Sequence, residues 1–123
     1  MTKNGSEQRE PSRAAQLTEL GDLAVSSDSD GDVRTISLFG ELDIATADGV
    51  ERELERAEAT DARTIILDLS GLTFISSTGI ALVLSAHARS RAAADRLTLL
   101  RGPASVQRVF ELSGVDDLLP FAE

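Results

Sequence analysis

The spacing of apolar and polar residues changes along the chain, and each change marks a predicted element. Residues 33–39 alternate between apolar and polar and include β-branched side chains, which predicts a half-buried strand. Residues 64–69 are almost continuously apolar, as in a central strand that is covered on both faces. Residues 97–100 predict another buried strand, and the apolar positions within residues 20–25 predict a short first strand.

Apolar residues recur at helical spacing in three further segments, which predicts three helices. The first is expected to follow Thr46 as its N-cap. The second is predicted from Ser77 to about Arg91, and the third begins near Pro103 and ends at Gly114 as its C-cap. The residues expected on their buried faces are Ala47, Val50, Leu54, Ala57, Ile80, Val83, Leu84, His87 or Ala88, Val106, Val109, Phe110 and Ser113.

Clusters of Ser, Asp and Gly mark the predicted turns. Residues 26–32 are expected to form a hairpin turn; they resemble a calcium loop only superficially, because the closing Glu and the following helix are absent. Residues 70–71 (Ser-Gly) predict a second turn, which separates the strand at 64–69 from a short apolar run at 74–75. Residues 118–121 are expected to close the chain as an extended segment.

The resulting order is strand, strand, helix, strand, helix, strand, helix and extended tail. This order predicts a single α/β domain with a small mixed β-sheet, right-handed crossovers and about three main helices. A chain of 123 residues has room for one core and little else. Residues 1–16 are polar and aperiodic, so we expect a disordered N-terminal tail there and the domain over residues 17–123.

Composition and charge disfavour several classes of function. The net charge is −9, with 21 acidic and 12 basic residues, so the chain would repel a phosphate backbone, and the absence of Trp and Tyr argues against stacking on bases. Without Cys there is neither a disulfide nor a thiolate metal site. No signal segment and no apolar run of membrane-spanning length is visible, so we expect a soluble cytoplasmic protein that binds neither nucleic acid nor membrane.

The chain offers little material for catalysis. Its single histidine, His87, falls in the middle of a predicted helix and is expected to be structural. No glycine-rich phosphate loop is present, and the only lysine, Lys3, lies in the predicted tail. Asp43 and Asp68 are expected near the same sheet edge, where two carboxylates beside the Ser77 hydroxyl could bind a metal or act as acid and base, although loop capping is the more common role of such residues. We therefore expect a protein that is not an enzyme and holds no metal or cofactor.

Three hydroxyl residues stand immediately before the longest predicted helix. Ser76 is predicted to be its N-cap, with Ser77 and Thr78 in the first turn. That turn carries free backbone amides and the positive end of the helix dipole. An exposed hydroxyl there is well placed for phosphorylation, because a helix N-terminus tolerates anions. Plain helix capping is the alternative interpretation of the same residues.

Two motifs then carry a resemblance to a known family. The first comprises residues 40–43 (Gly-Glu-Leu-Asp) and 46–47 (Thr-Ala), and the second comprises residues 68–72 (Asp-Leu-Ser-Gly-Leu) and 74–79 (Phe-Ile-Ser-Ser-Thr-Gly). In order, separation and expected secondary structure they resemble the signature of STAS domains and, more narrowly, of the bacterial anti-sigma-factor antagonists. The resemblance extends from about residue 17 to residue 121.

The resemblance implies a switch that works by binding rather than by catalysis. Such antagonists bind an anti-sigma factor that is also a serine kinase, and thereby free the sigma factor. The kinase phosphorylates a serine at the start of the central helix, which ends the binding, and a serine phosphatase restores it. The matching phosphoacceptor is Ser77, with Ser76 and Thr78 as alternatives. The implied partner-binding residues are Glu41, Asp43, Thr46, Ser76, Ser77, Thr78 and Gly79, with capping as an alternative role for Thr46.

The chain departs from the family pattern at two positions. Ser76 stands where the family usually has Asp, which leaves helix capping intact but removes a charge beside the phosphoacceptor. Ala81 stands where Gly is common. The first departure keeps a second hypothesis open, a constitutive STAS interaction module such as a scaffold or a transport accessory subunit. A third hypothesis, a nucleotide-binding domain, is disfavoured by the lack of a phosphate loop.

Overall fold

A five-stranded mixed sheet with three α-helices forms the architecture. The computed structural model describes residues 16–122. The strands lie in the spatial order β1-β2-β3-β4-β5; β1, β2 and β3 are antiparallel, and β3, β4 and β5 are parallel. The predicted α/β class, mixed sheet and three helices are confirmed. In chain order the elements are β1 (Gln16–Leu20), β2 (Leu23–Asp30), β3 (Val33–Leu42), α1 (Ala47–Glu58), β4 (Thr64–Ile75), α2 (Ser77–Ala92), β5 (Leu97–Leu100), α3 (Ala104–Leu112) and a 3₁₀ turn, η1 (Asp116–Leu118).

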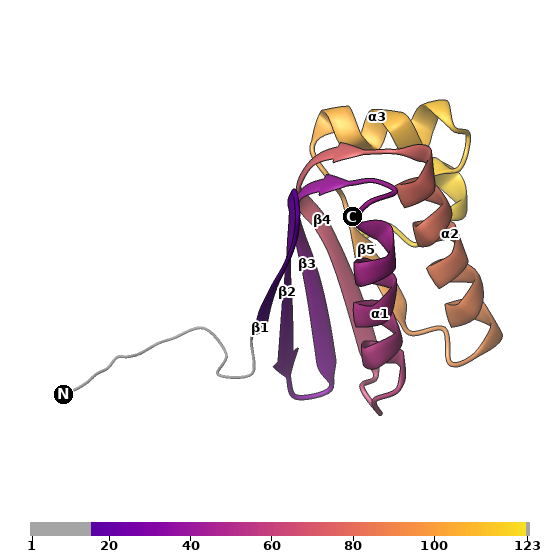
Figure 1. The fold of residues 1–123 in the computed structure, drawn as a ribbon. Coiled ribbons are helices and arrows are strands. Elements are labelled where there is room, and N and C mark those ends of the chain that lie inside the picture. Colours follow the sequence, from indigo (N-terminus) through magenta and orange to yellow (C-terminus); the bar gives the residue numbers. More distant parts are fainter. Residues whose placement is uncertain (1–15, 123) are drawn as a thin grey trace.

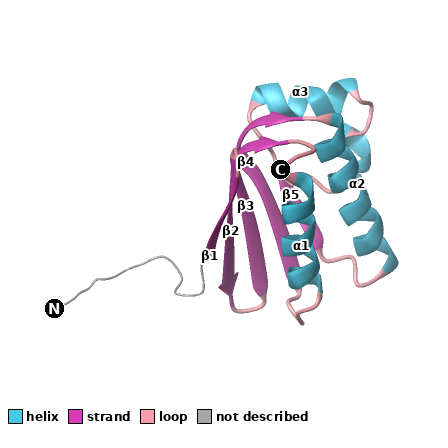
Figure 2. Cartoon of the chain, in the orientation of Figure 1, coloured by secondary structure: helices cyan, strands magenta, loops and turns pink. Residues whose placement is uncertain are grey.

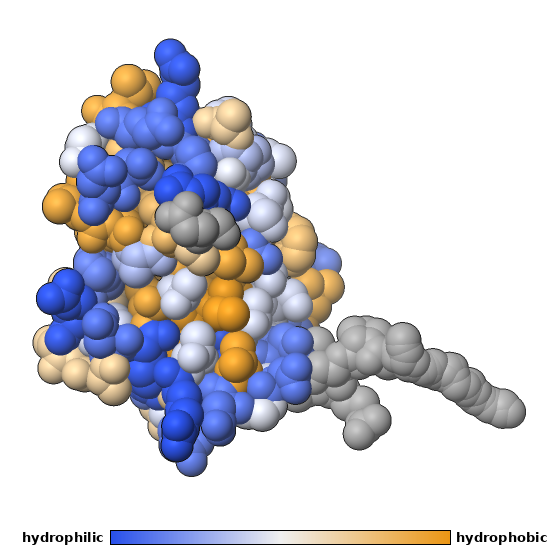
Figure 3. Space-filling view, turned by 180° about the vertical axis from the view of Figure 1, so that it is seen from behind, coloured by the Kyte–Doolittle hydropathy of each residue, from blue (hydrophilic) through white to orange (hydrophobic). Residues whose placement is uncertain are grey.

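The helices α1 and α2 lie side by side against the sheet, and α3 crosses its upper end (Figures 1 and 2). Alternate residues of the strands are buried in one apolar cluster with these helices, whereas their neighbours on β4, such as Ile66, are only half-buried. The expectation that this strand is covered on both faces is therefore wrong. Seen from behind, the surface mixes apolar and charged residues (Figure 3). The buried strand residues are Leu23, Val25, Ile36, Leu38, Leu42, Ile65, Leu67, Leu69, Leu72, Ile75, Leu97 and Leu99.

Each helix buries the face that its spacing predicts, with a few differences. All four residues expected to be buried on α1 are buried. On α2, Leu84 and His87 are only half-buried and Ala88 is exposed, because the helix turns Leu82 and Ala86 to the core instead. On α3, Val106 and Phe110 are buried, but Val109 is half-buried and Ser113 is exposed beyond the helix end. Gly114 follows with a φ of +75°, as expected for a C-cap glycine.

The N-terminal strands differ from the prediction. Residues 20–25 form no single strand, because the chain turns at Gly21–Asp22 and makes the β1–β2 hairpin. Residues 26–30 continue β2 rather than forming a turn, and Asp28 pairs with Thr35 of β3. The turn comes later, at Gly31 with a φ of +60°. Pairing with β3 outweighs the low strand propensity of Ser and Asp.

The predicted turn at Ser70–Gly71 is also absent, and β4 runs through it to Ile75. Two register shifts against β3 accommodate this stretch. A Cβ on Gly71 would lie 2.5 Å from Cδ1 of Phe39 and 2.6 Å from the carbonyl oxygen of Leu38. Glycine therefore serves here for close approach between neighbouring strands rather than for a turn.

Residues beyond α3 return to the sheet. Leu118 belongs to the 3₁₀ turn, and the extended part begins at Leu119. The backbone of Leu99 on β5 donates to the carbonyl of Pro120 at 3.0 Å and accepts from Ala122 at 2.8 Å. The ring of Phe121 meets that of Phe110 edge-on, with centroids 5.3 Å apart. This segment covers an edge of β5 that would otherwise present unpaired backbone groups.

Candidate functional site

The two sequence motifs meet where β3 and β4 end. Because these strands are parallel neighbours, their carboxyl ends lie at the same edge of the sheet, with Leu42 paired to Ile75. The backbone N–H of Ser76 donates to the carbonyl oxygen of Leu42 at 2.9 Å. The loop between β3 and α1 and the first turn of α2 are therefore joined directly.

The start of α2 has the geometry of a capped helix. Ser76 is extended, with φ −95° and ψ 175°, and its Oγ accepts a hydrogen bond from the N–H of Gly79 at 3.3 Å. Its carbonyl oxygen accepts from the N–H of Ile80 at 3.0 Å. The N-cap prediction is confirmed. Ser76 and Thr78 are half-buried, whereas Ser77 is exposed.

Gly79 allows α2 to start against the end of β3. A Cβ at this position would lie 2.7 Å from Cγ1 of Ile75, 3.0 Å from Cγ of Leu42 and 3.1 Å from the carbonyl oxygen of Leu42. Such contacts are shorter than van der Waals packing allows. Gly79 is buried, so its place in the site is to position the first turn of the helix.

Thr46 fastens the loop between β3 and α1. Its side chain is 3% exposed, and its Oγ1 donates to the carbonyl oxygen of Glu41 at 3.0 Å and accepts from the N–H of Asp43 at 3.0 Å. Thr46 stands at the N-cap position of α1, as predicted. Its side chain makes no hydrogen bond to that helix, however, so the prediction that its hydroxyl group caps the helix is wrong. Asp43 Oδ1 accepts from the N–H of Ala45 at 3.0 Å and tightens the same loop.

Charge is unevenly distributed at this end of the domain. Residues 35–51 contain no Lys or Arg, and they include Glu41, Asp43 and Asp48. Residues 69–88 contain no charged side chain at all, counting the single His as neutral. Glu41 and Asp48 are exposed and Asp43 is half-buried. Acidic side chains therefore outnumber basic ones in the loop beside Ser77, where Arg52 shares a surface hollow with Asp43 and Asp48. Along α2 the first charged side chain is Arg89.

Comparison with known proteins identifies the family of the chain. The model of the STAS domain family matches residues 24–123. The chain belongs to the STAS domain family. An anti-sigma F factor antagonist from Lysinibacillus sphaericus is 37% identical over 82 residues, which cover 65% of this chain and 69% of the relative. The structure of SpoIIAA, an anti-sigma factor antagonist, in its unphosphorylated form has a TM-score of 0.62 at 29% identity and covers 89% of both chains. The Bacillus cell fate determinant SpoIIAA in the phosphorylated form has a TM-score of 0.57 at 29% identity, over 89% of this chain and 92% of that one.

Asp43 and Asp68, which the sequence analysis expected near the same sheet edge, lie far apart in the structure. Asp43 is in the loop after β3, whereas Asp68 lies within β4, paired with Ser37 and Leu100. Its Oδ1 accepts from the N–H of Ser70 at 2.9 Å, and β4 continues for roughly 20 Å beyond it. Asp43 and Asp68 therefore cannot act together on Ser77. Among residues 16–122, no group of three or more His, Asp or Glu side chains is arranged to hold a metal ion.

His87 lies away from the hydroxyl groups. It stands on α2 roughly 15 Å along the helix from Ser77. Its Nδ1 is buried and makes no hydrogen bond among the described residues. His87 is therefore too far from Ser77 to serve as its base. In this same described part of the chain, no helix is long and apolar enough to cross a membrane.

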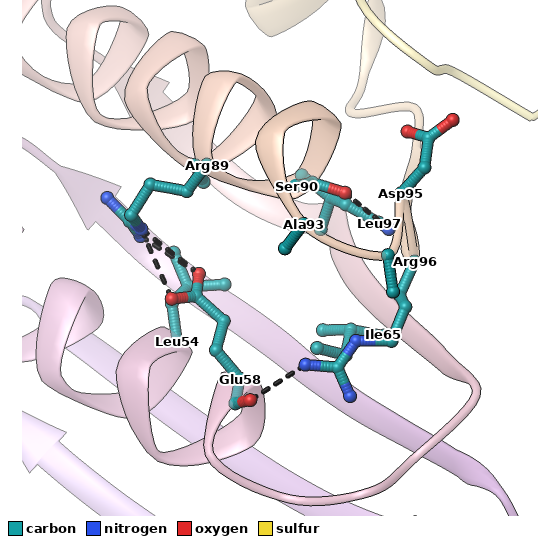
Figure 4. A pocket seen from close by; sticks show the side chains of 11 residues that line it. Leu54, Glu58, Ile65, Arg89, Ser90, Ala93, Asp95, Arg96 and Leu97 are labelled. Atoms are coloured by element: carbon teal, nitrogen blue, oxygen red, sulfur yellow. Dashed lines mark hydrogen bonds and ion pairs between the residues drawn. The ribbon is translucent and has the colours of Figure 1, made fainter.

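A cleft of about 110 Å³ opens between the far ends of α1 and α2 (Figure 4). Arg89 of α2 reaches across to α1, where its Nε donates to Glu58 Oε1 at 3.1 Å and its Nη2 lies 2.6 Å from Glu51 Oε2. Arg96 donates to the carbonyl oxygens of Glu58 at 2.7 Å and Ala62 at 2.6 Å. These guanidinium groups bind the protein itself, so they hold the two helices together and are not free to bind a ligand.

Three exposed apolar side chains near the site were missed in the sequence. Ile44 is 80% exposed in the loop after β3, Phe74 is 49% exposed at the end of β4, and Phe39 is 48% exposed on β3. Ile44 gave one local signal, because it is a large apolar residue inside a polar loop. Phe39 and Phe74 each lie next to a buried strand residue, so their exposure depends on which face of the sheet the helices cover.

Proposed function

We propose that this STAS domain is an anti-sigma-factor antagonist that is switched off by phosphorylation of Ser77. In the unphosphorylated form it binds an anti-sigma factor with serine kinase activity and thereby frees a sigma factor. A serine phosphatase restores the binding form, and the cycle runs in the cytoplasm. The domain supplies a surface and a phosphoacceptor, with no catalysis of its own.

The observation that carries the proposal is the exposure of Ser77 beside a capped helix start. Ser76 already uses its Oγ as a cap, at 3.3 Å from the N–H of Gly79, and Thr78 is half-buried. Among these three hydroxyl groups, Ser77 is therefore the most accessible to a kinase. The names of the relatives support an antagonist role, and a phosphorylated form of SpoIIAA is among the structural neighbours.

A phosphate on Ser77 would change the surface more than the fold. The helix N-terminus stabilises such a phosphate by about 0.3–1 kcal/mol. Glu41 and Asp43 border the site and oppose that gain by repelling the new charge, and residues 35–51 and 69–88 contain no Lys or Arg to pair with it. The domain should therefore stay folded, while a partner that covers Ser77 must accommodate a charge of about −1.5 to −2.

Intact mass spectrometry tests the proposal. The full chain and its Ser77→Ala, Ser76→Ala and Thr78→Val variants are incubated with ATP and each purified anti-sigma kinase of the same genome. One added phosphate that disappears only in Ser77→Ala is the expected result. Loss only in Ser76→Ala or Thr78→Val would move the switch to that residue. Stable binding to an anti-sigma factor without any phosphate would replace the switch by a constitutive STAS interaction module.

A further inference from the structure

Two exposed apolar residues are close in sequence to the hydrogen bond between Ser76 and Leu42, one on each of the two segments that it joins. Ile44 comes two residues after Leu42, and Phe74 comes two residues before Ser76. Phe74 also pairs with Glu41 across β3 and β4. Since the bond joins the two segments at 2.9 Å, Ile44, Phe74 and Ser77 are held at one end of the domain.

Exposed large hydrophobic side chains are concentrated at this end of the domain. Single exposed apolar residues are common on soluble proteins and need no explanation. Within residues 16–122, however, three of the six large hydrophobic side chains that are exposed belong to the ends of β3 and β4 and the loop after β3. Those three are Phe39, Ile44 and Phe74, and the other three, which lie on β1, α3 and η1, are Leu17, Leu112 and Leu118.

The charged residues around this end of the domain indicate which kind of partner surface would bind it. Glu41 and Asp48 are exposed and Asp43 is half-buried. Asp43 and Asp48 line a surface hollow together with Asp22 and Arg52, so acidic side chains outnumber the one basic side chain there. Stable interfaces place apolar residues and few charges at their centre and polar residues at the rim. A negative rim is complementary to a positive one, which favours the correct partner and speeds the encounter.

We infer that Ile44 and Phe74 are the apolar anchors by which this domain holds its anti-sigma factor, and that the partner offers an apolar pocket bordered by Arg or Lys. This inference rests on the proposed function and names the chemistry of the same surface. It also gives phosphorylation a physical means to end binding. A phosphate on Ser77 would lie at the same end of the domain as the anchors, so a partner that covers both would have to remove water from its charge.

The test compares matched substitutions of exposed apolar residues. Ile44→Ser and Phe74→Ser are made at the site, and Leu112→Ser and Leu118→Ser, at positions 77% and 63% exposed, are the controls. Affinity for the anti-sigma factor that binds the wild-type chain is measured by calorimetry at two salt concentrations. We expect each site variant to bind at least tenfold more weakly, and each control to stay within twofold of wild type. Higher salt should weaken binding of the wild-type chain.

The outcomes separate the two proposals. Ile44 is 80% exposed, so its substitution leaves the fold intact even if Phe74→Ser lowers stability. Wild-type affinity in Ile44→Ser would overturn the anchor and leave the proposed function standing. If the affinity does not depend on salt, the inference that Arg or Lys borders the pocket of the partner is wrong. If none of the purified anti-sigma factors of the same genome binds the wild-type chain, the proposed function fails and this inference fails with it.

Discussion

The backbone N–H of Ser76 lies 2.9 Å from the carbonyl oxygen of Leu42, and this one bond connects the two halves of the site. On one side is the loop fastened by Thr46, and on the other is the first turn of α2 with Ser77 at its surface. Because Leu42 and Ile75 are register partners in parallel strands, the bond follows directly from the pairing of β3 with β4. Ser77 and the loop after β3 therefore lie at one edge of the sheet.

The Ser76 cap should contribute measurable stability. Replacing Ser76 by Ala leaves the N–H of Gly79 without its partner, and such a loss typically costs about 1 kcal/mol. Ser76→Asp should retain the cap, because a carboxylate accepts the same bond and favours the helix N-terminus. Urea denaturation of both variants measures the difference. Equal stability of Ser76→Ala and wild type would show that the side-chain bond contributes nothing.

Gly79 should tolerate no side chain. Helix propensity alone predicts that Gly79→Ala gains about 1 kcal/mol. The new Cβ, however, would lie 2.7 Å from Ile75 Cγ1 and 3.1 Å from the backbone oxygen of Leu42, so we expect a net loss of about 1–2 kcal/mol. Thermal and urea unfolding measure this change. A variant more stable than wild type would mean that α2 can move away from β3 at little cost.

Thr46 should stabilise the loop through its hydroxyl group. Thr46→Val keeps the shape of the side chain but removes the hydrogen bonds to Glu41 and Asp43, which we expect to cost about 1–3 kcal/mol. Thr46→Ser is the matched control, because it keeps the hydroxyl. Hydrogen exchange of the Asp43 amide should speed up in the Val variant alone. Unchanged exchange in Thr46→Val would show that the loop is held by other contacts.

Glu51 should make stability depend on pH. Burial raises the pKa of Glu51 above its ordinary value of 4.5, and the charges of Glu55 and Glu58 add to that rise while Arg89 opposes it. A raised pKa in the folded state means that the contribution to stability is complete below the unfolded pKa and is lost as pH rises through the folded pKa. Relative to Glu51→Gln, the wild-type chain should therefore lose free energy of unfolding as the pH rises above the ordinary pKa of 4.5.

Urea denaturation at pH values below and above 4.5 compares the wild-type chain with Glu51→Gln and with Glu111→Gln, an exposed control on α3. The ion pair of Glu51 with Arg89, 2.6 Å long, shifts the absolute stabilities but enters the pH dependence only through the pKa. A difference between wild type and Glu51→Gln that stays constant with pH would contradict the prediction.

Local sequence patterns were sufficient to predict those helices whose buried residues recur at helical spacing. The spacing of Ala47, Val50, Leu54 and Ala57 predicted the buried face of α1, and the hydroxyl before the apolar run predicted Ser76 as the cap of α2. Such features depend on contacts within one or two turns, so neighbouring residues carry the information. The paired motifs around residues 40–47 and 68–79 likewise indicated the family from sequence alone.

Tertiary structure decided what depends on pairing between distant segments. Residues 26–30 and 70–71 have turn-like composition, but they became strand because the hydrogen bonds of β3 were available on both sides. The register between β3 and β4 brings Ser76 next to Leu42, and it places Asp68 far from Asp43. Phe74 is exposed and Ile75 buried because α1 and α2 cover only one face of the sheet, so neighbouring residues on a strand meet opposite surroundings. The sequence pattern by itself thus determined the three helices and the candidate phosphoacceptor, whereas strand pairing and the one-sided helical layer decided the course of the strands and which residues surround Ser77.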